Sequence, residues 1–101
     1  NRKAKFLQFI KHILGLEVLE TFVESVSSSF DSFIQEHNYL SSRQLQFLDI
    51  LKKYILEKGN LEKKNLIESP FTMIHPEGIR GVFSPKEINE ILQLTNKILA
   101  A

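Results

Sequence analysis

Apolar residues recur every three to four positions along most of this chain, which is the spacing of one face of an α-helix. The pattern predicts four main helices, over residues 3–14, 16–36, 41–58 and 84–99. A short helical turn over residues 60–67 is expected before Pro70, which cannot continue a helix. No stretch of useful length alternates apolar and polar residues as a strand does. The predicted fold is therefore all-α, a compact bundle of four main helices plus one short helical turn.

Sequence signals mark where these helices begin and end. Gly15 and Gly59 follow the first and third helices, and glycine is favoured there because it tolerates the left-handed conformation of many helix ends. The segments Ser41–Gln44 and Ser84–Glu87 have the capping-box pattern of a helix start. The second helix is predicted to be the longest, and one continuous helix is favoured over a bend near Ser28. The third helix is expected to bury Leu45, Phe47, Leu48, Leu51, Tyr54 and Ile55.

The segment from Pro70 to Phe83 fits neither a helix nor a strand. Its prolines fix φ and its glycines allow positive φ, so the chain must turn here at least twice. Its large apolar side chains are too many for a solvated linker. We expect an ordered loop that packs against the ends of the surrounding helices. The residues expected to shape this loop are Pro70, Phe71, Gly78, Gly81 and Phe83.

Length and composition indicate one globular domain over residues 1–101, with 43% hydrophobic and 25% charged residues. The formal net charge of +1 gives no general attraction for nucleic acid or lipid, so any basic surface must be local. Cysteine is absent, which excludes disulfides and cysteine metal sites and is ordinary in a reducing cytoplasm. No apolar run approaches the roughly 20 residues of a membrane span. We expect a soluble cytoplasmic protein and, because the chain begins at Asn1 without a methionine, a fragment of a larger one.

The first two helices carry opposite charges. The second helix contains acidic residues and no lysine or arginine, so the two helices can pair with each other. The cations at the start of the chain are also candidate phosphate contacts. A solvated helix face is the favoured interpretation, because the phenylalanines between them fall on the buried stripe. The candidate phosphate contacts are Arg2, Lys3, Lys5 and Lys11.

No phosphate-binding loop, nucleophile elbow or zinc-binding helix motif occurs in the sequence, and no catalytic, cofactor or metal residue is predicted. Glu62–Lys64 has the E-x-K spacing of metal-dependent nucleases, but that chemistry needs a second carboxylate and a rigid platform. The triplet falls in the expected short helical turn, and glutamate and lysine are common in exposed segments, so we reject it as a site. His12 and His37 are interpreted as ordinary histidines. Arg80, together with His75 in the same loop, is a candidate partner contact, because buried neighbours can hold its guanidinium rigidly. Capping of a neighbouring helix explains Arg80 equally well.

Four motifs follow one another in a fixed order before the last helix. They are a Q-x-x-F helix opening at Gln44–Phe47, a glycine turn at Lys58–Leu61, P-F-T at Pro70–Thr72, and a G-[aliphatic]-x-G-[aliphatic]-F turn at Gly78–Phe83. In this order they resemble the C-terminal domain of the R subunits of type I restriction enzymes. Residues 3–36 fit the preceding helices of that family more loosely, so the resemblance covers nearly the whole chain.

The resemblance implies a C-terminal fragment of a large subunit that translocates and cleaves DNA with ATP and Mg²⁺. It implies that this domain helps to attach the subunit to a methyltransferase core of modification and specificity subunits, in a bacterial or archaeal cytoplasm. The fragment would then be a monomeric, non-catalytic docking domain without a cofactor of its own. The alternative is an accessory DNA-binding domain. The alternative is motivated by the basic first helix and by Lys52, Lys53, Lys63, Lys64 and Arg80.

Overall fold

The computed structural model describes residues 1–18, 20–68 and 82–100, with the side chains of 63–68 left undescribed. The described residues form four helices and no strand: α1 Arg2–Leu14, α2 Phe22–Glu36, α3 Ser42–Glu68 and α4 Pro85–Ala100. The prediction of an all-α bundle with four main helices is confirmed.

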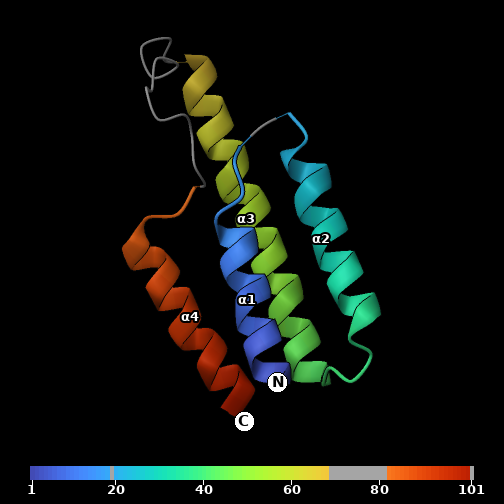
Figure 1. Ribbon diagram of the computed structural model, residues 1–101. Helices are drawn as coiled ribbons and strands as arrows, with labels where there is room; N and C mark the ends of the chain where they lie inside the picture. The colour runs from blue at the N-terminus through green and yellow to red at the C-terminus, as the bar shows by residue number, and fades with distance from the viewer. Residues whose placement is uncertain (19, 69–81, 101) are drawn as a thin grey trace.

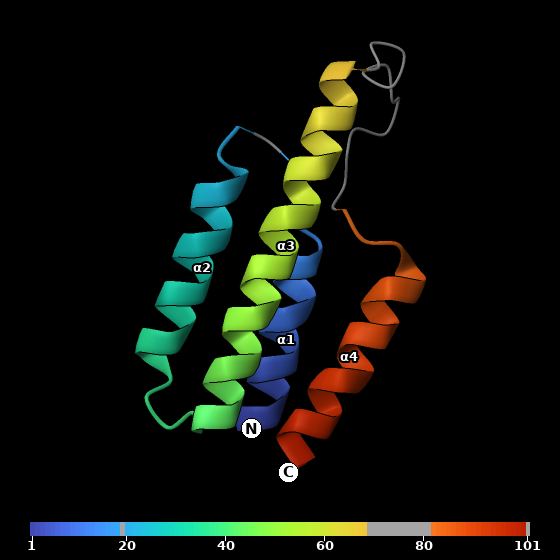
Figure 2. The same cartoon turned by 180° about the vertical axis from the view of Figure 1, so that it is seen from behind.

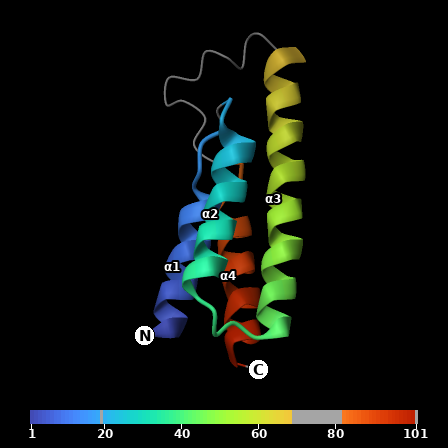
Figure 3. The same ribbon diagram turned by 90° about the vertical axis from the view of Figure 1, so that its right-hand side faces the viewer.

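The helices run up, down, up and down, so that each lies antiparallel to its neighbour in sequence (Figure 1). α1 packs most extensively on α4 and α2 on α3, while α1–α2 and α3–α4 complete the bundle. The start of α1, the end of α4 and the connection between α2 and α3 lie together at one end, which we call the base (Figures 1 and 2). At the opposite end α3 extends beyond the other helices (Figure 3).

The core between α1 and α2 consists of phenylalanine rings. Phe9 stacks on Phe33 with ring centroids 4.2 Å apart, and Phe30 meets Phe9 edge to face at 5.2 Å. Phe6 contacts Phe33 and Phe47, at 5.7 and 6.5 Å. Because these large rings fill the space between the two helices, the backbones of α1 and α2 approach less closely than those of α1 and α4. α3 and α4 close the core with aliphatic side chains, among them Leu48, Leu51, Ile55 and Ile91.

The second helix begins at Phe22 and not at Leu16 as predicted. The start of α2 lies further from the base than the end of α1 does (Figure 1). The chain therefore runs away from the base between the two helices. Leu16 and Val18 therefore cover the core from this connection, Val18 being buried. The apolar pattern continues across the connection because these two residues, like those on the buried face of a helix, pack against the core. From Phe22 onward α2 runs unbroken through Ser28, as favoured.

The predictions for the third helix need two corrections. α3 does not end at Gly59 but continues to Glu68, so the predicted turn over 60–67 is part of it. With 27 residues α3 is also the longest helix, in place of the second. Gly59 is buried against the ring of Phe22, and a Cβ at this position would lie 2.8 and 2.9 Å from the ring's Cδ1 and Cζ. Glycine at this position allows α2 to approach α3 closely. The local sequence alone indicates a helix end at Gly59, because the contact with Phe22 cannot be seen in it.

Helix caps follow the predictions more closely. The Ser41 Oγ accepts from the Gln44 N–H at 3.1 Å, and the Gln44 side chain accepts from the Ser41 N–H at 3.0 Å. Ser84 and Glu87 make the same reciprocal pair at the start of α4, at 3.2 and 3.1 Å. Gly15 ends α1 as expected, but with φ −96° and not in the left-handed conformation. Its N–H reaches the carbonyls of the last turn directly, so positive φ is not needed.

Most of the predicted Pro/Gly loop lies outside the described residues. This applies to the expected loop residues Pro70, Phe71, Gly78 and Gly81, and to the candidate contacts His75 and Arg80. Phe83, at the end of the segment, is described and is buried, as predicted.

Candidate functional site

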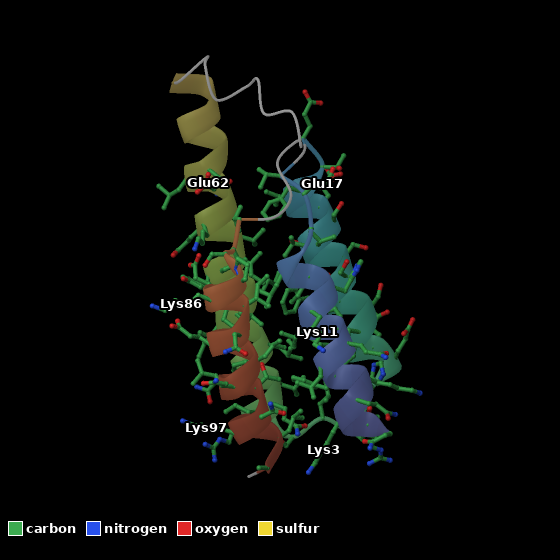
Figure 4. The ribbon with its side chains drawn as sticks, turned by 60° about the vertical axis from the view of Figure 1, so that its left-hand side comes forward. Lys3, Lys11, Glu17, Glu62, Lys86 and Lys97 are labelled. Carbon is green, nitrogen blue, oxygen red and sulfur yellow. The ribbon has the colours of Figure 1, made fainter. Side chains whose placement is uncertain are left out.

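The four cations predicted as phosphate contacts do not form one cluster. Arg2 and Lys3 line a cavity of about 290 Å³ at the base of the bundle, which we call the base cavity. Lys5 and Lys11 are exposed elsewhere on α1. Figure 4 shows Lys3 near the base and Lys11 higher on the same helix. No ion pair among the described residues joins α1 to α2, so the predicted pairing of the basic and acidic helices is not found. The reason is that the facing sides of these helices carry phenylalanine rings and the charges lie on their outer sides.

Arg2 is held in place by an aromatic stack that the sequence did not predict. Its guanidinium carbon lies 4.0 Å from the ring centroid of Tyr39, in cation–π geometry. Tyr39 meets the ring of His37 edge to face at 5.6 Å, and His37 stacks on Phe33 at 4.1 Å. The Nδ1 of His37 also lies 2.7 Å from the Phe33 carbonyl oxygen, at hydrogen-bond distance. The stack connects the start of α1 to the end of α2.

The base cavity combines an apolar floor with a cationic rim. Phe6, Leu40 and Leu99 contribute apolar surface, and the hydroxyl of Ser41 and the side chain of Gln44 belong to the cap of α3. None of the described residues that line the cavity is acidic. The cavity is therefore electropositive at its rim and apolar inside.

A second surface lies on the outer side of α3. Ile50, Tyr54 and Leu61 leave 60%, 46% and 62% of their surface exposed. Their spacing of four and seven residues puts them on one face of the helix, and we call them the outer stripe. The buried face of α3 carries Leu48, Leu51 and Ile55. Tyr54 and the 38% exposed Leu45 were predicted to be buried, and the structure corrects both assignments. α3 thus has an apolar face toward the core and, on its solvent side, three exposed apolar residues beside the exposed Glu57.

α4 is fixed to α3 beside this stripe. The ammonium of Lys58 donates to the Glu87 carboxylate and lies 4.7 Å from the ring centroid of Phe83. Phe83 in turn packs against Tyr54, with ring centroids 5.7 Å apart. The hydrogen bond from Lys58, followed by that from the Ser84 backbone N–H, lowers the pKa of Glu87 from 4.5 to about 2. The start of α4 is therefore held by a charged contact on an aromatic base.

The described residues contain no group of three or more histidine, cysteine, aspartate or glutamate side chains placed to hold a metal ion. Glu62, from the rejected E-x-K triplet, is half-buried on α3 and belongs to no such group. Among the described helices, none combines the length and hydropathy needed to cross a membrane.

Comparison with known proteins identifies a family that matches nearly the whole chain. No curated protein and no solved structure matches the chain. Residues 1–100 match the family described as EcoEI R protein C-terminal. The match covers more than nine-tenths of the chain and includes all four helices described above. The chain therefore belongs to the family of C-terminal domains of type I restriction enzyme R subunits, as its motif order indicated.

Proposed function

We propose that this domain is a non-catalytic docking module that attaches a type I restriction enzyme R subunit to its methyltransferase core. Family membership supports the setting. The resemblance to R subunits implies that the parent subunit assembles with modification and specificity subunits. In this proposal the ATP- and Mg²⁺-dependent movement and cleavage of DNA belong to other parts of the subunit. The domain supplies a surface and not a reaction.

The observation that carries the proposal is the outer stripe on α3. A helix of a small domain normally has one apolar face, and α3 also exposes three large apolar residues on its solvent side. A partner that covered Ile50 and Leu61 would remove their apolar surface from water. This burial favours binding by about 25 cal/mol for each Å² of apolar surface. Tyr54 adds an aromatic ring with a polar end, a residue type that is enriched at protein interfaces. The stripe also belongs to the longest helix, which extends beyond the other helices at one end (Figure 3).

The exposed cations favour a second candidate function, an accessory DNA-binding domain. Figure 4 shows Lys3 and Lys11 on α1 together with Lys86 and Lys97 on α4, with Glu17 and Glu62 toward the other end of the bundle. Docking remains the stronger proposal, because the cations of α1 do not form one cluster: Arg2 and Lys3 line the base cavity, and Lys5 and Lys11 lie elsewhere. Arg80 and His75 stay in the docking proposal as candidate partner contacts by sequence alone.

The test measures affinity of the domain for a purified core of modification and specificity subunits. We expect Ile50→Ser with Leu61→Ser to weaken binding by about tenfold or more, as for apolar residues at the centre of an interface. Leu94→Ser on α4, where leucine is 53% exposed, is the matched control and should change affinity by less than about twofold. Unchanged affinity of the double variant, with its melting temperature preserved, would remove the stripe from the docking surface.

A further inference from the structure

The base cavity lies at the opposite end of the bundle from the part of α3 that projects, and the outer stripe does not explain it (Figure 1). Its volume of about 290 Å³ is at the lower end of the ~300–1,000 Å³ typical of small-ligand pockets. The space suits one or two side chains of a partner better than a folded element or a large cofactor.

The lining residues define what such an occupant must offer. Phe6, Leu40 and Leu99 favour an aliphatic side chain on the floor of the cavity. Arg2 and Lys3 favour a carboxylate at the rim, where none of the described lining residues is acidic. Because Arg2 is already ordered on Tyr39, it loses less side-chain entropy on meeting a carboxylate than a free arginine would.

We propose that the base cavity receives a short acidic peptide segment of a protein partner. An aliphatic side chain of the segment packs on Leu40 and Leu99, and a neighbouring carboxylate meets Arg2 and Lys3. The inference rests on the proposed function only in taking the partner to be a protein.

Charge alone would also attract nucleic acid, but the geometry favours the peptide. A nucleobase binds such sites by stacking on an aromatic face. One face of Tyr39 is covered by the Arg2 guanidinium, and its ring is in edge-to-face contact with His37. The apolar floor also offers nothing to a phosphate. An aliphatic residue next to an acidic one uses both parts of the cavity.

The test is an NMR titration of the isotope-labelled 101-residue chain with a blocked peptide carrying leucine between two glutamates. We expect amide shifts confined to the residues that line the base cavity. The same peptide with glutamines in place of the glutamates should bind at least about fivefold more weakly, since the charge-assisted contacts are lost.

Arg2→Gln and Lys3→Gln should each weaken binding of the glutamate peptide by about five- to tenfold. Lys5→Gln removes the same charge from α1 outside the cavity and should change affinity by less than about twofold.

Several results would overturn the assignment. Equal binding of the two peptides would remove the role of the carboxylate, and equal losses in Arg2→Gln and Lys5→Gln would mean diffuse attraction by α1. Displacement of the peptide by a 12-base-pair duplex at lower concentration than by unlabelled peptide would assign the cavity to nucleic acid. The two proposals fail separately. If the stripe variant loses affinity for the methyltransferase core but the base cavity binds no peptide, only this inference is overturned. If the cavity binds the peptide but the stripe variant keeps its affinity for the core, only the docking role of α3 is overturned.

Discussion

Gly59 sits in the middle of α3 with the ring of Phe22 against it, so a side chain at this position has no free space. In an exposed helix interior, alanine in place of glycine stabilises by roughly 1 kcal/mol. Here we expect Gly59→Ala to lower the free energy of unfolding by about 1–3 kcal/mol, because the methyl group overpacks the contact between α2 and α3. Chemical denaturation measures this difference.

Two further variants isolate the cause. Asn60→Ala, at the exposed neighbouring position, should be neutral or slightly stabilising through helix propensity. In a Phe22→Leu background the smaller side chain leaves room, so the added cost of Gly59→Ala should shrink. The same cost in both backgrounds would show that the contact with Phe22 is not what requires glycine.

At the level of the elements, the charged contact between Lys58 and Glu87 joins the start of α4 to α3. The pKa of Glu87 is lowered to about 2, so its carboxylate stabilises the folded state at pH values above about 4.5. This contribution is lost as the pH falls from about 4.5 toward 2, where the folded protein also binds the proton. We therefore expect unfolding stability to decline through this window.

Glu87→Gln separates the charge from the cap, since glutamine also serves at this position of a capping box. The variant should be less stable than the wild type at pH 7, and the difference should narrow as the pH approaches 2. Glu90→Gln, at an exposed position one turn along α4, is the control for the loss of one carboxylate. Parallel pH profiles for the wild type and Glu87→Gln would show that the contact with Lys58 does not hold α4.

The sequence predicted those parts of the elements that depend on neighbours in the chain. The capping boxes at Ser41 and Ser84 form as expected, because both partners lie within one turn. The end of the third helix was misplaced because glycine is required at position 59 by its contact with Phe22, a residue of another helix. The start of the second helix was misplaced because Val18 is apolar to cover the core from a connection.

The candidate site also divides into features that depend on neighbours in the sequence and features that depend on residues far apart in it. Cations at the start of the chain were singled out because they lie close together in the sequence, and the structure places two of them, Arg2 and Lys3, at the base cavity. The base cavity was missed, because it brings Arg2 together with Tyr39 and Leu99 from distant parts of the chain. The outer stripe was missed for another reason. Periodicity identifies apolar positions on a helix but cannot tell which of two apolar faces meets the core.

For the molecule as a whole, the net charge of +1 conceals an uneven distribution. Four cations and no acid lie between residues 2 and 11, whereas residues 12–42 contain five acids and no lysine or arginine. The exposed acids of the second region are Glu17, Glu20, Glu24, Asp31 and Glu36. A partner therefore meets a basic α1 and an acidic α2 on adjacent sides of the bundle. A duplex approaching α1 would be attracted by one helix and repelled by the next.

The salt dependence of duplex binding tests this distribution. If all four cations of α1 contacted phosphates, log K against log salt would have a slope of about −3.6, at about −0.9 for each neutralised phosphate. We expect α1 to contribute a slope no steeper than about −2, because Arg2 and Lys3 line the base cavity, whose apolar residues give a phosphate no partner, which leaves Lys5 and Lys11 on this helix. Lys5→Gln with Lys11→Gln should then remove most of the part of the slope that α1 contributes, while Arg2→Gln should leave the slope nearly unchanged. A slope near −4 that falls by about one for each of the four substitutions would instead establish α1 as a DNA-contacting helix and favour the accessory DNA-binding function over docking.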